Sequence, residues 1–119
     1  MSRPFTTITT EIPSGEALSS EVDLGDWDLE AILTPAAWTT AALTFLGTTT
    51  SGGTDVSLFE DAGNEISVAC AVDRYISITG TDKTAIRAIR WLTIRSGTLA
   101  TPVNQAAVRT LTLVLRKGQ

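Results

Sequence analysis

Residues 95–118, RSGTLATPVNQAAVRTLTLVLRKG, contain the pattern that decides the fold. Leu111, Leu113 and Leu115 alternate with threonine and valine, and this period of two predicts a strand with one buried face. The run at 92–94 predicts a second strand, and the segment between them, 96–107, is too long for a tight hairpin. Loops of about a dozen residues without secondary structure are uncommon in compact domains and usually carry function, so this loop is a candidate site.

The same alternation recurs along the whole chain, and glycine, proline, asparagine or aspartate separates most of the runs. Eight or nine short strands at this spacing indicate a sandwich or a barrel. The segment FEDAGNEI, residues 59–66, predicts a hairpin in which Gly63 takes a positive φ. Helix is limited to single turns near 34–43 and after Thr81. The remaining predicted strands are 6–10, 27–33, 43–45, 56–58, 66–68 and 76–78.

We therefore predict an all-β protein, an antiparallel β-sandwich of jelly-roll type with about eight strands. Residues 16–119 are expected to form a single domain, and residues 1–15 an extended arm set apart by Pro13, Ser14 and Gly15. The arm either pairs with the sheet of its own chain or reaches a neighbour, where a free strand adds to a sheet edge through main-chain hydrogen bonds. Phe5 and Ile8 are its candidate contact residues.

Composition excludes most familiar enzyme mechanisms. Histidine is absent from the 119 residues, which removes the usual general base and every catalytic triad built on imidazole. Cys70 lies in an apolar alternation and is expected to be a buried hydrophobic residue. Asp26, Asp28 and Glu30 fit a solvated strand face better than a calcium site. We expect no enzyme activity, no cofactor and no metal, and we expect Trp38 and Trp91 to fill the core, a sugar-stacking platform being the alternative.

Acidic and basic residues are segregated along the sequence. Residues 1–73 hold one basic and twelve acidic residues, whereas residues 74–119 hold eight basic residues and one acidic. One interpretation is that Arg87, Arg95, Arg109 and the other arginines pair with these carboxylates inside the fold; the other is that they meet a neighbouring copy or a larger partner. The acidic net charge of −4 makes nucleic acid a poor partner. No apolar run is long enough for a membrane helix, and the start lacks the apolar core of a signal peptide.

Three stretches resemble small structural proteins of tailed bacteriophages, prophages and gene-transfer particles. They are IPSGEALSSEVDLGDWDLEAILTPAAWTTAALTFLG from Ile12, LFEDAGNEISV from Leu58 and RWLTIRSGTLATPVNQAAVRTLTLVLR ending at Arg116. The resemblance covers nearly everything between Ile12 and Arg116. It implies a virion component with a discoidin-like jelly roll, associated with the phage head, and it brings no catalytic residues.

The expected function is that of a non-enzymatic virion protein, a decoration or cement protein on the outer surface of the capsid. The alternative is a carbohydrate-binding module of a head spike or tail part that contacts the host; a hydrolase is a remote third. The expected partners are the major capsid protein or other virion proteins, further copies of the chain, and a glycan under the alternative, with no nucleic acid and no membrane. The protein is expected in the virion, assembled in the cytoplasm of the host bacterium.

The loop 96–107 supplies the other candidate contacts. Ser96 begins it with a turn, Pro102 stiffens it, and Asn104 and Gln105 offer amide donors and acceptors that suit docking on a protein surface. The alternative is a structural crossover whose Val103 folds back on the core. The complete set of expected partner-binding residues is Phe5, Ile8, Arg87, Arg95, Ser96, Asn104, Gln105 and Arg109.

Overall fold

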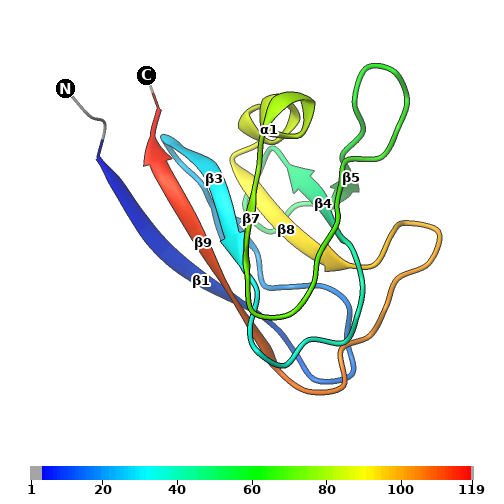
Figure 1. Cartoon of the computed structure of the whole chain (residues 1–119). Coiled ribbons are helices and arrows are strands. Elements are labelled where there is room, and N and C mark those ends of the chain that lie inside the picture. The colour runs from blue at the N-terminus through cyan, green and yellow to red at the C-terminus, as the bar shows by residue number, and fades with distance from the viewer. Residues whose placement is uncertain (1–3, 119) are drawn as a thin grey trace.

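The chain folds into two antiparallel β-sheets packed face to face, with one short helix at an end (Figure 1). The computed structural model describes residues 4–118. The first sheet contains, in spatial order, β1 (Phe5–Ile12), β9 (Arg109–Lys117), β3 (Trp27–Leu33) and β7 (Tyr75–Ser77). The second contains, in order, β2 (Val22–Asp23), β8 (Trp91–Ser96), β4 (Leu43–Thr48) and β5 (Val56–Ser57), with β6 (Ser67–Val68) also paired to β4.

The two packed antiparallel sheets confirm the predicted all-β sandwich. The strands β1 to β4 alternate between the two sheets along the chain. As a result, β1 and β3 lie on either side of β9 in the first sheet, and β2 and β4 lie on either side of β8 in the second. Each predicted strand is present. The structure adds β2, which was not predicted because it has only two residues and lies in a polar segment.

The core lies between the two sheets and is built by the alternation of apolar residues. In β9, Leu111, Leu113 and Leu115 are at most 2% exposed, while the residues between them face away from the core. Ile94 of β8 and Phe45 of β4 close the core from the second sheet. Burying a side chain of this size contributes about 1.5–3 kcal/mol, so the leucine row of β9 is a main source of stability.

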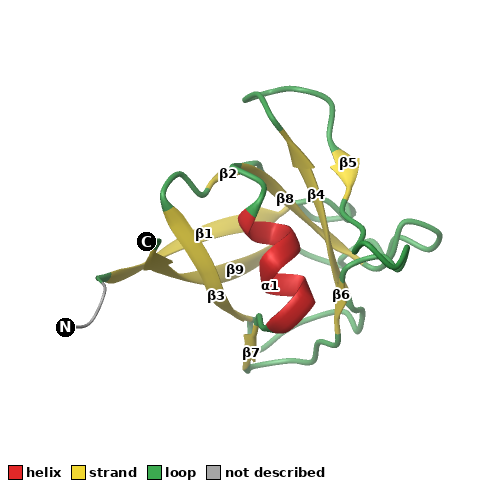
Figure 2. Ribbon diagram, turned by 90° about the horizontal axis from the view of Figure 1, so that it is seen from above, coloured by secondary structure: helices red, strands yellow, loops and turns green. Residues whose placement is uncertain are grey.

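The helix α1 (Gly80–Arg87) is longer than the single turn that the sequence indicated. Figure 2 shows it lying across the end of the sandwich, between β3 of one sheet and β8 and β4 of the other. Ile86 is buried in the core, and its burial explains why an isolated short helix forms here. Residues 34–43 contain no helical turn, and α1 is not long and apolar enough to cross a membrane; no other helix occurs within 4–118.

The hairpin predicted at 59–66 is present. Phe59 and Glu65 form an isolated antiparallel bridge, and the Gly63 N–H donates to the Glu60 carbonyl at 2.9 Å. Gly63 has φ 93°, the positive value that the turn requires.

The segment assigned to an N-terminal arm is part of the first sheet. All of β1 pairs with β9, from Phe5 opposite Arg116 to Ile12 opposite Arg109. Of the two alternatives, pairing within the chain is therefore the one observed. Residues 1–3, which the predicted arm also included, lie outside the described part of the chain.

Candidate interaction surface

The crossing between β8 and β9, the orange segment in Figure 1, extends beyond the sheets and is held at several points by hydrogen bonds. Gly97 and Pro102 form a bridge, and the Val103 N–H donates to the Ser96 carbonyl at 2.9 Å. The Gln105 N–H donates to the Glu16 carbonyl, also at 2.9 Å. The turn at 98–101 reaches solvent, and Leu99 within it is 54% exposed.

Gln105 is fully buried and holds this crossing to the loop that follows β3. Its Oε1 accepts a hydrogen bond from the Thr39 N–H at 2.8 Å and one from Arg109 Nε at 3.1 Å. Its Nε2 donates to the Thr39 carbonyl at 3.0 Å and to Ser96 Oγ at 2.7 Å. Ser96 is also fully buried. Gln105, Ser96 and Arg109 therefore serve the fold, and of the loop residues predicted to dock only Asn104 is exposed.

Arg95 is buried as well, with 4% of its surface exposed. Its Nη2 lies 2.5 Å from Glu65 Oε2, and the same nitrogen donates to Ser57 Oγ at 3.1 Å. Its Nε donates to Thr44 Oγ1 at 2.9 Å. A guanidinium satisfied in this way is a cross-link between the second sheet and the 59–66 hairpin, so we do not assign Arg95 to a docking surface.

Several of the segregated charges pair with one another inside the chain, as in the first of the two interpretations, whereas Arg109 donates to Gln105 and Thr39 instead of a carboxylate. Besides Arg95 and Glu65, the pairs include Arg87 with Asp28 at 3.5 Å and Arg90 with Asp23 at 2.9 Å. Hydrogen bonds from Arg90 lower the pKa of Asp23 below its usual value. The other pairs are Arg116–Glu30, Lys83–Glu30 and Lys117–Asp26.

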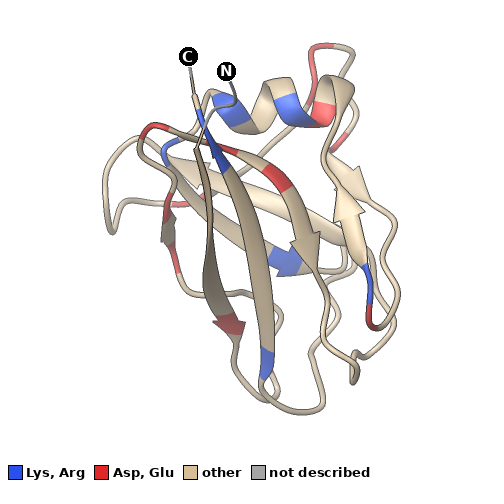
Figure 3. Ribbon diagram, turned by 60° about the vertical axis from the view of Figure 1, so that its left-hand side comes forward, with Lys and Arg blue, Asp and Glu red and all other residues tan. Residues whose placement is uncertain are grey.

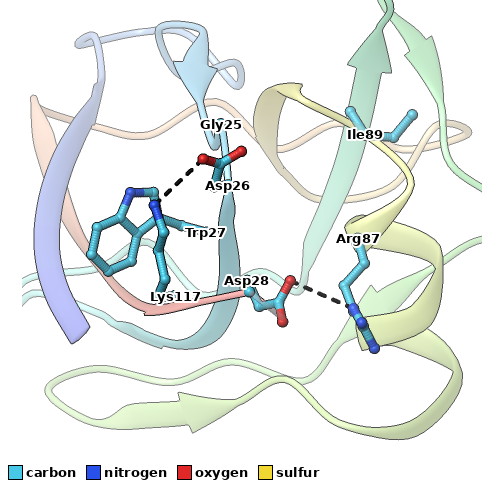
Figure 4. A pocket seen from close by; sticks show the side chains of 8 residues that line it. Gly25, Asp26, Trp27, Asp28, Arg87, Ile89 and Lys117 are labelled. Atoms are coloured by element: carbon cyan, nitrogen blue, oxygen red, sulfur yellow. Dashed lines mark hydrogen bonds and ion pairs between the residues drawn. The ribbon is translucent and has the colours of Figure 1, made fainter. Parts of the chain in front are cut away.

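One open pocket of about 370 Å³ lies at the end of the sheets near α1 (Figure 4). Lys117 Nζ lies 3.4 Å from Asp26 Oδ2 across it and 5.3 Å from the centre of the Trp27 ring. Figure 4 shows Arg87 turned toward Asp28 on the other side. These charges face each other rather than a shared centre, and within residues 4–118 no group of acidic residues or cysteine is arranged to hold a metal ion. The charged side chains that line the pocket are thus engaged in ion pairs.

Cys70 and the three tryptophans are buried or half-buried side chains. Trp38 is 6% exposed, and Cys70 is half-buried against the edge of the core. Burial raises the pKa of the Cys70 thiol to about 11, although the nearby Arg74 charge lowers it in part. Trp91 is half-buried, with the Arg90 guanidinium 4.7 Å from its ring centre.

The outer face of the first sheet carries a surface without charged residues between its two ends. Registers across the sheet place its side chains in two rows, which we call the uncharged face. The rows are Thr7–Val114–Ala31–Ser77 and Thr9–Thr112–Leu33–Tyr75. The side chains mix methyl and hydroxyl groups, and Tyr75 is 65% exposed.

Charged residues frame this face at both ends. Glu11 pairs with Thr110 beyond one row, and Arg116 stands between Phe5 and Asp28 beyond the other. Figure 3 shows blue and red segments toward the ends of β1 and β9 with tan between them, and a red segment partway along β3, where Glu30 lies. Protein interfaces have the same arrangement, a centre depleted of charge inside a polar rim. The surface is thus suited to docking on another protein.

Sequence reasoning missed most of this face, although Phe5 lies at its border. The available signal was the lack of charge at the positions of β1 and β9 that alternate with core residues, such as Thr7, Thr9, Thr112 and Val114. Ile8 faces the core and is half-buried. Arg87 is exposed on α1 and is paired to Asp28, away from the face.

No family model matches this chain, and no curated protein matches it. Among solved structures, the fold is similar to that of the SPBc2 prophage-derived protein YomS, with a TM-score of 0.54 over 96% of each chain. The two sequences are 11% identical, so the similarity is one of fold.

Proposed function

We propose that this chain is a non-enzymatic structural protein of a phage particle, a decoration or cement protein bound to the outer surface of the head. The uncharged face is the observation that carries the proposal. Its partner is the major capsid protein or another virion protein, and Tyr75 is the aromatic anchor, since tyrosine is enriched at the centre of interfaces. The protein is assembled in the cytoplasm of the host bacterium and resides in the virion.

Two independent similarities support the phage assignment. The chain shares its fold with a prophage-derived protein along almost the whole length of both. The stretches between Ile12 and Arg116 resemble small virion proteins of tailed phages. These similarities concern phage proteins in general. The location on the head and the role in decoration are the parts of the proposal that binding and copy-number experiments test.

The tryptophans give little support to the alternative of carbohydrate binding. Trp38 is buried, and the rings of Trp27 and Trp91 each have a cation over them, Lys117 and Arg90 respectively. A sugar needs an aromatic ring face that is free to stack. The docking function is therefore preferred.

The decisive variant places a charge in the middle of the uncharged face. Thr112 lies on β9, an inner strand, so Thr112→Arg changes the face without touching a sheet edge. Thr49→Arg is the matched control, because Thr49 is an exposed threonine in the loop between β4 and β5. We expect Thr112→Arg to lower binding to particles lacking this protein by at least about tenfold, and Thr49→Arg to bind like wild type, in co-sedimentation assays.

Equal binding of the two variants would exclude the face as the attachment site. Quantitative mass spectrometry of purified particles tests the role itself. Hundreds of copies per particle are expected for a decoration protein. A handful would instead indicate a spike, connector or tail part, and a glycan array would then show whether the chain binds sugars.

A further inference from the structure

The outer edge of β1 is a long strand edge that the fold leaves open. Within residues 4–118, β1 pairs with β9 on one side and with no strand on the other. The outermost strands elsewhere in the two sheets are β7, β2, β5 and β6, each of two or three residues. β1 has eight residues and therefore presents by far the longest unpaired edge among them.

The backbone groups that face outward follow from two hydrogen bonds. The Pro4 carbonyl accepts from the Lys117 N–H of β9 at 2.8 Å, so even-numbered residues of β1 face β9. The Glu11 carbonyl accepts from Ser20 N–H at 3.1 Å on the opposite side, so odd-numbered residues face outward. Because backbone groups alternate along a strand, Phe5, Thr7 and Thr9 each present an N–H and a carbonyl to the open edge.

This edge lacks the features that usually prevent strands from pairing. Natural edges carry lysine, proline, bulges or inward-pointing charges, or are covered by a loop. From Phe5 to Thr9 the sequence is FTTIT, with no charge and no proline, and β1 pairs with β9 without a register shift. Ser20 covers the edge only at Glu11, beyond this segment.

We propose that this edge binds a second copy of the chain, with the two β1 strands antiparallel about a two-fold axis at Thr7. In this register Thr7 pairs with Thr7 of the second copy, and Phe5 pairs with Thr9. All outward N–H and carbonyl groups of the three residues are then satisfied, and the Ser20 contact at Glu11 is left intact. The two first sheets become one continuous sheet, as in strand addition.

Charge favours this orientation. The acidic end of β1, at Glu11, lies at the opposite end of the sheet from Arg116, which pairs with Phe5. An antiparallel pair brings the Glu11 end of each copy toward the Arg116 end of the other, whereas a parallel pair would bring Glu11 beside Glu11. Opposite charges at such distances select the orientation more than they add affinity.

The area of the uncharged face gives a second argument for two copies. With strands about 4.8 Å apart and side chains on one face about 6.8 Å apart along a strand, the two rows cover roughly 260 Å². A standard interface buries about 800 Å² on each partner, so one copy offers a small docking area. Pairing at β1 places two uncharged faces side by side in one surface.

Sedimentation equilibrium of the full chain tests the proposal over the micromolar range. The wild type is expected to form a species of twice 12.6 kDa. Thr7→Pro removes an outward N–H that no described strand uses, and proline is tolerated on edge strands at such positions. We expect it to raise the dissociation constant about ten- to a hundredfold. Thr7→Val retains the N–H and a branched side chain, so it should dimerise like wild type.

Amide hydrogen exchange measured by NMR on the wild-type protein tests the proposed register of the two β1 strands. In the dimer the amides of Thr7 and Thr9 should be protected, and dilution should expose them, while Ile8, which faces β9, stays protected at both concentrations. A monomer at all concentrations, or free exchange of Thr7 and Thr9 in the dimer, would overturn the proposal. Protection of these amides only on phage particles would also overturn it, by assigning the edge to another protein. Thr112 lies on β9, away from the edge, so Thr112→Arg tests particle binding without altering the edge. Thr7→Pro is read by sedimentation of the free protein, so the two proposals fail separately.

Discussion

Gln105 and Thr39, 66 residues apart in sequence, exchange hydrogen bonds in both directions. The Thr39 N–H donates to Gln105 Oε1 at 2.8 Å, and Gln105 Nε2 donates to the Thr39 carbonyl at 3.0 Å. The pair connects the crossing before β9 to the loop after β3. A buried amide with this many partners has a structural role, which stability measurements can test directly.

Replacing Gln105 with alanine should destabilise the protein without unfolding it. The variant leaves the Thr39 N–H and carbonyl and Ser96 Oγ without their partner in a buried region. Each unsatisfied buried group costs about 1–3 kcal/mol, and partial hydration reduces the sum, so we expect a loss of about 2–4 kcal/mol in the free energy of unfolding. Urea denaturation followed by circular dichroism measures it. Asn104→Ala, at the exposed neighbouring position, should have little effect, and equal losses in both variants would contradict the role of Gln105.

The ion pair between Arg95 and Glu65 should contribute strongly to stability. Glu65→Gln leaves the guanidinium, whose side chain is 5% exposed, without its carboxylate. Breaking a buried pair from one side costs about 3–5 kcal/mol, and we expect the lower end because the Glu65 side chain is 17% exposed. The control is Asp23→Asn, which breaks an exposed pair with Arg90 and should shift the urea midpoint far less. A similar shift of the urea midpoint in both variants would show that the buried Arg95 pair contributes no more to stability than the exposed pair.

The strands were predictable because a half-buried strand has a period of two that survives in the sequence. The runs around Phe45, Ile94 and Leu113 each show it, and each became a strand of the core. Helix α1 was underestimated, because Gly80 and Thr81 are weak helix formers. The burial of Ile86, a tertiary contact, compensates for them.

The candidate contacts were harder to predict because they depend on long-range neighbours. Nothing local distinguishes Gln105, which is buried, from Asn104, which is exposed; the difference is the Thr39 backbone that lies beside Gln105. The uncharged face was hard to predict for the same reason, since it also depends on long-range neighbours. Thr9 and Tyr75 become members of one surface only because β9 and β3 lie between their strands.

Cys70 should react slowly with alkylating reagents in the folded protein. Burial raises the pKa of its thiol to about 11, and the thiolate is the reactive form. The ordinary pKa of a cysteine thiol is 9.0, so at pH 8 the folded protein holds roughly a hundredth of the usual thiolate fraction. Iodoacetamide labelling should therefore be about a hundredfold slower than in urea-unfolded protein, and its rate should still be rising at pH 10. A native rate equal to the unfolded rate would contradict the burial of this thiol.

Gly97 should tolerate no side chain, because it has φ 91° and its surroundings are backbone. A Cβ atom there would lie 2.5 Å from the Thr101 carbonyl oxygen and 2.6 Å from the Val103 nitrogen. We expect Gly97→Ala to lower the free energy of unfolding by at least about 2 kcal/mol. Gly63, with a similar φ of 93° and nothing within 4 Å of its Cβ position, is the matched control. Gly63→Ala should cost about 1 kcal/mol, and the difference between the variants measures the contact at the start of the crossing.

Attachment of the protein to phage particles should depend little on salt. Three arginines that the sequence offered as a basic surface are engaged within the chain, Arg87 with Asp28, Arg90 with Asp23 and Arg95 with Glu65. The two rows of the uncharged face contain no aspartate, glutamate, lysine or arginine. The Debye length falls from about 10 Å at 0.1 M to about 3 Å at 1 M, so a contact between charged surfaces would weaken steeply over this range.

We expect the occupancy of wild-type protein on particles to change less than about twofold between 0.1 and 1 M sodium chloride in co-sedimentation. Apolar contacts do not lose strength as salt rises, so the docking that we propose predicts a flat profile. Arg87→Glu, which alters an exposed charge on α1, should then bind like wild type at both salt concentrations. A steep loss of wild-type binding at 1 M, together with weak binding of Arg87→Glu at 0.1 M, would instead place the attachment site on the charged end of the sandwich beside α1.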